Sequence, residues 1–114
     1  MFGKTAVCLV CMSSFVVAAG SSAAGEKKVT IGLIGDSTVA NTYGWGPAFA
    51  ELVKDRAKVI NQAKNGATLA SLSKKLKVLL KQKPDYVLIQ FGHNDMKRYD
   101  AKTYSAKLKD YVER

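Results

Sequence analysis

Three short polar clusters in the sequence contain residue types that suit acyl transfer. They are Gly35-Asp36-Ser37, Asn65-Gly66 and Gly92-His93-Asn94-Asp95. A serine hydroxyl directly after a strand can attack a carbonyl carbon, and the backbone N–H of the same serine can bind an anion. Gly66 allows a substrate oxygen to approach backbone N–H groups closely, and the Asn94 amide can donate to the same oxygen. Ser37, Gly66 and Asn94 are therefore candidates for an oxyanion hole, in which each donor is worth roughly 3 kcal/mol.

Each cluster also has a purely structural interpretation. Ser37 could cap a helix, and the other two clusters could be ordinary turns and loops. We expect Asp36 to brace its turn by side-chain hydrogen bonds rather than to act in catalysis. We also expect His93 and Asp95 to support the structure rather than to take part in a reaction.

The elements that must position these clusters alternate between strands and helices. Apolar runs rich in β-branched residues predict strands at 29–34, 58–61 and 86–91. Helical spacing of apolar residues predicts helices at 47–55, 69–80 and 100–112, with Pro84 stopping the second and Asp100 capping the third. Such alternation is typical of a doubly wound, parallel α/β fold. Ligands of such sheets bind outside the carboxyl ends of the strands, which is where the three polar clusters fall.

The first 24 residues have the pattern of a secretory signal peptide. A basic start ends at Lys4, an uncharged, mostly apolar stretch follows from Thr5 to Ala19, and small residues lead to a cleavage site predicted after Ala24. A membrane anchor is the alternative, but the apolar stretch is shorter than the roughly 20 residues that a spanning helix needs. We therefore expect residues 25–114 to be secreted or periplasmic, with no stable membrane anchor after cleavage.

The composition is that of one small, basic, globular domain. Removing 24 of the 114 residues would leave 90 and would lower the formal charge from +9 to +8. Both cysteines, Cys8 and Cys11, fall in the predicted signal, which leaves the exported part without a disulfide or a thiol nucleophile. The positive charge could draw the protein to a polysaccharide that carries carboxylates. Nucleic acid would also respond to this charge, but export and the lack of interleaved basic and aromatic residues argue against it.

In their order and spacing, the three clusters resemble the first three sequence blocks of the SGNH or GDSL hydrolases, over residues 29–112. Gly35-Asp36-Ser37-Thr38, Gly44-Trp45-Gly46 and Phe91-Gly92-His93-Asn94-Asp95 most resemble the rhamnogalacturonan acetylesterases of that superfamily. The resemblance implies a three-layer, flavodoxin-like sheet with helices on both faces. It also implies a serine esterase without metal or organic cofactor, in which Ser37 attacks an acetyl carbonyl. The Ser37 and Gly66 backbone N–H groups and the Asn94 side chain would then hold the oxyanion.

The sequence departs from the family pattern at the general base. Family members carry an Asp-x-x-His element near their C-terminus, whereas the only histidine here is His93, which is not the base in the family. Loss of such a base can lower turnover by about 10⁶-fold. We therefore expect residues 25–114 to be the N-terminal part of one SGNH hydrolase domain, holding its first three strands. Alone, this part should be nearly inactive, and the unpaired edge of its 86–91 strand should make it unstable or oligomeric.

The sequence thus predicts a secreted esterase that removes O-acetyl groups from an acidic, plant-type polysaccharide such as rhamnogalacturonan. One alternative is a lipase or esterase of the same family with another acyl substrate, and a second is a non-catalytic carbohydrate-binding remnant. A nucleotide- or phosphate-binding module fits least, because residues 32–35 match neither the dinucleotide glycine pattern nor a Walker loop. Trp45 is expected to pack against the sheet or the second helix, with stacking on a sugar ring as the alternative.

Overall fold

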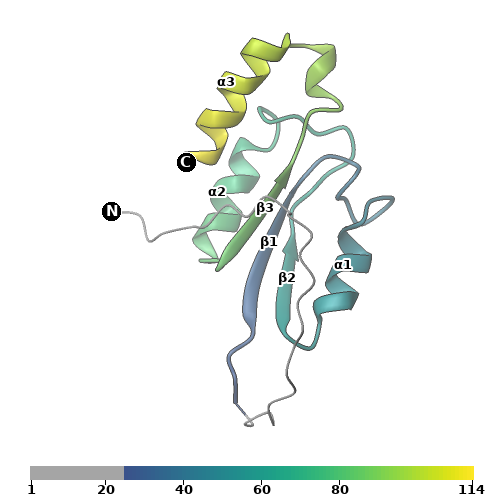
Figure 1. Cartoon of the computed structure of the whole chain (residues 1–114), viewed down its shortest axis with the longest axis vertical. Helices are drawn as coiled ribbons and strands as arrows, with labels where there is room; N and C mark the ends of the chain where they lie inside the picture. The colour runs from purple at the N-terminus through teal and green to yellow at the C-terminus, as the bar shows by residue number, and fades with distance from the viewer. Residues whose placement is uncertain (1–24) are drawn as a thin grey trace, which may run out of the picture.

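Three parallel strands form one sheet in the computed structural model, which describes residues 25–114. The strands are β1 (Val29–Gly35), β2 (Ala57–Asn61) and β3 (Tyr86–Gln90). The helices are α1 (Gly46–Val53), α2 (Ser73–Lys81) and α3 (Ala101–Val112), with a short 3₁₀ helix, η1 (Asp95–Lys97), before α3. Figure 1 shows α1 on one side of the sheet and α2 and α3 on the other. The predicted α/β fold, a parallel sheet with helices on both faces, is confirmed. The predicted signal peptide, residues 1–24, lies outside the described residues.

The central strand is β1, because the strand order is β2-β1-β3. Leu33 of β1 lies beside Asn61 of β2 and Leu88 of β3. Successive residues Leu33 and Ile34 are both fully buried, one on each face of the sheet, as expected for an uncharged strand between two helical layers. All three strands run in the same direction, so their carboxyl ends and the loops that follow them lie at one edge of the sheet.

The larger core lies between the sheet and the pair α2 and α3. Its buried members are Ile34, Ala67, Leu69, Leu72, Leu76, Leu79 and Tyr111. We predicted that the leucine face of the second helix begins at Leu69, but α2 begins only at Ser73. The Thr68 hydroxyl accepts the Ser71 N–H and the Ser71 hydroxyl accepts the Thr68 N–H, and these side-chain bonds hold the stretch in turns. The Leu72 N–H donates to the Thr68 carbonyl oxygen at 3.3 Å, just before the helix begins. The first leucines therefore enter the core from turns.

The last helix begins as predicted and ends with one difference. Asp100 is its N-cap, and the carboxylate accepts the Thr103 N–H at 2.7 Å, a bond that lowers the pKa of Asp100. Tyr104 and Leu108 are half-buried against the core, and Tyr111 is buried in it. Val112, which we placed in the same apolar stripe, is 41% exposed. The correction follows from helical geometry, because a residue next to Tyr111 is rotated by about 100° from it.

One edge and part of one face of the sheet lack cover within residues 25–114. There, β3 pairs with β1 alone, so its outer edge makes no strand pairing. Tyr86, at the start of β3, is 44% exposed, since α1 lies over β2 instead. No helix in the described part of the chain is long and apolar enough to span a membrane.

Two glycines allow the segment before α1 to lie directly against the turn that follows β1. A Cβ at Gly44 would lie 2.5 Å from the carbonyl oxygen of Thr38. A Cβ at Gly46 would lie 2.2 Å from the Val39 carbonyl oxygen and 2.3 Å from Nδ2 of Asn61. All three distances are shorter than van der Waals contact, and the atoms in the way include backbone carbonyl oxygens. This close approach is what brings the Trp45 segment next to Ser37.

We expect Gly46→Ala to lower the free energy of unfolding by about 2 kcal/mol, because the new methyl group must push the loop backbone and Asn61 apart. The measurement is the urea midpoint of residues 25–114 followed by circular dichroism. Gly66→Ala is the comparison, since space is open around Gly66 but its φ of 73° strains any side chain. It should cost about 1 kcal/mol. A larger loss at Gly66 than at Gly46 would contradict this account.

Candidate active site

The three polar clusters lie in loops that hydrogen-bond to one another at the carboxyl edge of the sheet. The Asp36 N–H donates to the Gln90 carbonyl oxygen at 3.2 Å, which joins the end of β1 to the end of β3. The Lys64 N–H donates to the Gly35 carbonyl oxygen at 3.0 Å, which joins the loop after β2 to the end of β1. The predicted meeting of the loops is therefore built from backbone bonds between neighbouring strand ends.

Ser37 lies in a turn that Asp36 braces from inside. Asp36 is 1% exposed, and its Oδ1 accepts the Thr38 N–H at 2.9 Å and the Thr38 hydroxyl at 2.7 Å. The Asp36 carbonyl oxygen accepts the N–H groups of Val39 and Ala40, both at 3.1 Å. Ser37 itself is half-buried, and its N–H donates to no other group of residues 25–114. The turn thus holds the hydroxyl at the rim and leaves the adjacent N–H available to a ligand.

Gly66 supplies a second available N–H in the loop after β2. Its φ is 73°, in the left-handed region that glycine adopts without strain, and the space around it is open for 4 Å. The residue is exposed, and within the described part of the chain its N–H has no hydrogen-bond partner. A substrate oxygen could therefore approach this N–H without meeting a side chain.

Asn94 joins the third loop to the second. Its Nδ2 donates to the carbonyl oxygen of Ala67 at 3.0 Å. Ala67 directly follows Gly66 in the sequence. An amide nitrogen carries two hydrogens, so one remains for a ligand at this position. Asn94 is half-buried at the start of η1. The bond fixes the amide beside Gly66, as an oxyanion donor requires.

Asp95 holds the same pair of loops together from the core side. It is completely buried, and its Oδ1 accepts the Leu69 N–H at 3.1 Å. Its Oδ2 has no hydrogen-bond partner in the described residues. Because Leu69 lies three residues after Gly66, this bond limits the positions that the Gly66 loop can take.

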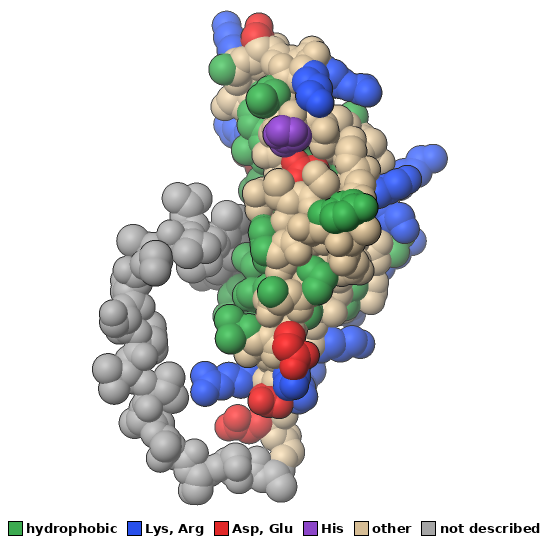
Figure 2. All heavy atoms as spheres, turned by 90° about the vertical axis from the view of Figure 1, so that its right-hand side faces the viewer, with side chains coloured by type: hydrophobic (Ala, Val, Ile, Leu, Met, Phe, Trp, Pro, Cys, Tyr) green, Lys and Arg blue, Asp and Glu red, His purple; other side chains and the backbone are tan. Residues whose placement is uncertain are grey.

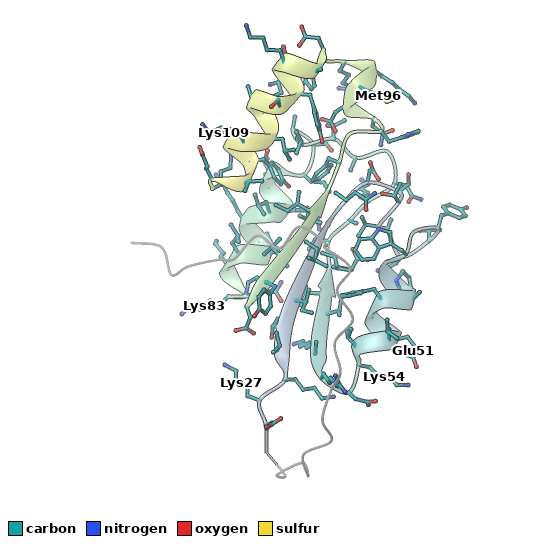
Figure 3. All side chains as sticks on the ribbon, viewed as in Figure 1. Lys27, Glu51, Lys54, Lys83, Met96 and Lys109 are labelled. Atoms are coloured by element: carbon teal, nitrogen blue, oxygen red, sulfur yellow. The ribbon has the colours of Figure 1, made fainter. Side chains whose placement is uncertain are left out.

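His93 lies on the outside of the site. It is exposed, and no side-chain hydrogen bond in residues 25–114 joins it to Ser37 or to any other residue. It is the single histidine of the sequence. Figure 3 places Met96, two residues after Asn94 on η1, at this same end of the molecule, and its side chain is 66% exposed.

Tyr104 supports the third loop from α3, whereas its helical spacing alone predicts only a core position. Its hydroxyl donates to the Phe91 carbonyl oxygen at 2.9 Å. Burial raises the pKa of Tyr104, and the nearby carboxylates of Asp95 and Asp36 raise it further, so the phenol stays a donor at neutral pH. The hydroxyl also lies under Gly92, where a Cβ would be 3.3 Å from it. The sequence signal for this role is a tyrosine hydroxyl in a helical stripe of largely apolar residues.

Asn61 was missed as a site residue. This last residue of β2 donates from Nδ2 to the Val39 carbonyl oxygen at 2.9 Å and to Oδ1 of Asn41 at 3.0 Å. It thus ties the loop after β1 to β2. The signal available in sequence is an asparagine that closes an apolar strand, in the same position relative to its strand as the other clusters.

Trp45 lies at this rim, against the end of the sheet. The sheet and the second helix were the two packing partners predicted for it, and it contacts the sheet, because α2 lies on the opposite side. The indole Nε1 donates to Oε1 of Gln90, at the end of β3, at 2.8 Å, and the ring makes an edge contact with Phe49. The side chain is 37% exposed. The close approach of the glycine-flanked segment to the Ser37 turn explains this position, because it carries Trp45 to the end of the sheet.

Residues 25–114 contain no group of three or more histidine, cysteine, aspartate or glutamate side chains placed to hold a metal ion. The arrangement offers a hydroxyl at Ser37, a backbone N–H at Gly66 and the Asn94 amide in loops at one edge of the sheet. Residues 33–114 match the model of the GDSL-like lipase/acylhydrolase family. The chain belongs to this family.

Two curated relatives of this GDSL-family chain are rhamnogalacturonan acetylesterases. The protein from Bacillus subtilis is 37% identical over 91 residues, which cover 70% of this chain and 39% of the relative. The protein from Emericella nidulans is 41% identical over 71 residues, which cover 58% of this chain and 28% of the relative. The family resemblance that the sequence motifs predicted is confirmed, and the chain spans less than half the length of these curated relatives.

A solved esterase has the same arrangement of elements. The psychrotrophic esterase EstA from Pseudoalteromonas superposes with a TM-score of 0.60 at 26% identity. The match covers 74% of this GDSL-family chain and 51% of that one. The three-stranded layout is therefore shared with a solved esterase.

Proposed function

We propose that residues 25–114 are the N-terminal part of one SGNH hydrolase domain, exported by the signal peptide at residues 1–24. The domain is a serine esterase that removes O-acetyl groups from an acidic polysaccharide such as rhamnogalacturonan. Family membership supports esterase chemistry, and the two curated relatives support this substrate. The formal charge of residues 25–114, which is +8 once Lys4 is removed from the +9 of the whole sequence, supports it as well, because a basic protein concentrates near a polymer of carboxylates.

In the proposed reaction, the Ser37 hydroxyl oxygen attacks the acetyl carbonyl carbon. The carbonyl π electrons move onto oxygen, and the Ser37 proton passes to a general base. Loss of the sugar alkoxide, which takes a proton from that base, leaves acetyl-Ser37, and water then releases acetate by the same two steps. The N–H groups of Ser37 and Gly66 and the Asn94 amide donate hydrogen bonds to the developing oxyanion. The observation that carries the proposal is the bond from Asn94 to Ala67, which holds the amide donor beside the Gly66 N–H.

The general base is the part of the mechanism that residues 25–114 do not supply. His93 is exposed and makes no hydrogen bond to Ser37 within these residues. The family resemblance implies an Asp-x-x-His element in this role, and the relatives have more than half of their length outside the matched region. We therefore place the base in a segment outside residues 25–114, and we expect these residues alone to be nearly inactive.

The test is acetate release by residues 25–114 joined at Arg114 to the remaining sequence of the Bacillus subtilis relative. We expect acetate from acetylated rhamnogalacturonan, weaker release from acetylated xylan, and none after Ser37→Ala. Ser105→Ala is the matched control, because it makes the same chemical change at an exposed serine of α3, away from the loops of the site. Full activity of the Ser37→Ala protein would refute Ser37 as the nucleophile.

Two outcomes would favour the alternatives instead. A preference for long-chain acyl esters over acetylated polysaccharide would indicate a lipase or esterase of the same family with another substrate. The second alternative is a carbohydrate-binding remnant that kept the donors and lost the base. Binding of the polysaccharide with no acetate release, even after the joined segment restores a folded domain, would indicate that remnant.

A further inference from the structure

Trp45 is attached to the Ser37 turn by its own backbone. The Trp45 N–H donates to the carbonyl oxygen of Thr38 at 2.9 Å, and Thr38 is the residue after Ser37. The two neighbouring glycines make this approach possible, since any side chain at Gly44 or Gly46 would collide with the same loop. The indole is therefore placed beside the proposed nucleophile by backbone geometry.

The indole ring is also held in one orientation. Its Nε1 donates to Oε1 of Gln90 at 2.8 Å, so the polar atom of the ring is satisfied within the protein. The ring meets Phe49 edge-on, with 5.7 Å between centroids and 87° between planes. An aromatic ring that is fixed before binding loses little conformational entropy when a ligand covers it. The side chain nevertheless remains 37% exposed.

The segment that carries Trp45 is polar but contains no charged residue. Residues 37–50 contain no lysine, arginine, aspartate or glutamate, although 24% of the whole sequence is charged. Asn41 and Thr42 are exposed, and Tyr43 is 84% exposed. Figure 2, which looks onto the α1 side, shows uncharged and hydrophobic groups across much of the middle of this face, with Lys and Arg side chains along one edge and further charged groups above and below. Hydroxyl and amide groups beside a flat ring suit a neutral sugar, which presents C–H groups on one face and hydroxyls at its edge.

We propose that Trp45 is a stacking platform for a neutral pyranose ring of the acetylated polysaccharide, with Gln90 and Phe49 as its positioning residues. The proposal rests on the proposed function, because the sugar that stacks belongs to the chain whose acetyl group reaches Ser37. It makes Trp45 a specificity-determining residue, since a carboxylate-bearing ring would find no cationic partner among residues 37–50.

The experiment uses the fact that residues 25–114 contain a single tryptophan. The protein formed by joining residues 25–114 at Arg114 to the remaining sequence of the Bacillus subtilis relative is titrated with rhamnogalacturonan oligosaccharides. The emission of its Trp45→Phe variant is subtracted, so that the recorded signal is that of Trp45. We expect a saturable shift of the emission to shorter wavelength, because a sugar ring on the indole excludes water. Oligogalacturonate, which has only charged rings, should bind more weakly at equal length. An unchanged emission spectrum, or equal binding of oligogalacturonate, would overturn the proposal.

Variants measured by titration calorimetry complete the test. Trp45→Ala should weaken oligosaccharide binding by at least about tenfold. Gln90→Met, which removes the acceptor of the indole N–H and leaves the ring, should also weaken it. Tyr86→Ala is the matched control, because Tyr86 is a comparably exposed aromatic at the other end of the sheet. The Tyr86→Ala protein should bind the oligosaccharide with unchanged affinity. Unchanged binding in both Trp45→Ala and Gln90→Met, or an equal loss in Tyr86→Ala, would overturn the proposal. Acetate release is measured separately, so a failure of stacking and a failure of the esterase function give different results.

Discussion

Joining residues 25–114 to the remaining sequence of the Bacillus subtilis relative is expected to raise acetate release by up to about 10⁶-fold over residues 25–114 alone. The physical reason is that the Ser37 hydroxyl has no hydrogen-bonded imidazole within these residues, so its proton has no acceptor of suitable pKa. The joined segment is expected to carry the Asp-x-x-His element of the family. The measurement is the initial rate of acetate release from acetylated rhamnogalacturonan.

The control for this experiment is the joined protein with the histidine of that element replaced by alanine. It has the same fold and edge cover but no base, and its rate should fall back toward that of residues 25–114. A His93→Ala variant of the joined protein should keep its activity, because His93 is exposed outside the site. Ready acetate release by residues 25–114 alone, abolished by His93→Ala, would show that His93 is the base and would contradict this prediction.

Asn94→Ala in the joined protein is expected to lower kcat by about 10²- to 10³-fold with little change in KM. Alanine removes the amide hydrogen that should donate to the oxyanion, which forms only in the transition state. The same substitution breaks the bond to the Ala67 carbonyl oxygen, so the free energy of unfolding should also fall by about 1 kcal/mol. Rates and urea midpoints are measured on the same preparations.

Asn65→Ala is the matched control for Asn94→Ala. Asn65 is an exposed asparagine next to Gly66, and its side chain makes no hydrogen bond among residues 25–114. Its replacement should change neither kcat nor stability appreciably. If Asn94→Ala changes stability by the expected amount but leaves kcat unchanged, Asn94 is a structural loop residue and not an oxyanion donor.

Two buried carboxylates hold the short loops of the site in place. Asp36 accepts two bonds from Thr38, and Asp95 accepts one from the Leu69 backbone. Each lies directly before or after a proposed functional residue, so that Ser37 and Asn94 are fixed by their immediate neighbours. Charge-assisted bonds of this kind are shorter and stronger than neutral ones. The acidic residues of the motifs thus act on loop geometry.

The strands, and the polar residues that follow them, could be predicted from local sequence patterns. Uncharged, branched runs next to Gly35, Asn61 and Gly92 predict strands that end abruptly, and the polar residues at those ends predict a shared edge. The start of α2 could not be predicted, because the apolar spacing continues back to Leu69, whereas the helical backbone begins only at Ser73. A leucine can reach the same core from a turn, and periodicity alone does not distinguish the two.

The sequence by itself determined the layered fold, the family, and the residues proposed for the reaction, because these depend on residue type and spacing along the chain. Only the tertiary structure decided which groups from different loops and strand ends are in contact: Asn94 with Ala67, Asp95 with Leu69, and Trp45 with Gln90. These pairs are separated by more than twenty residues and depend on the strand order and register of the sheet. Trp45 shows the difference most clearly, since its place beside Ser37 follows from two glycines whose only sequence signal is the absence of a side chain.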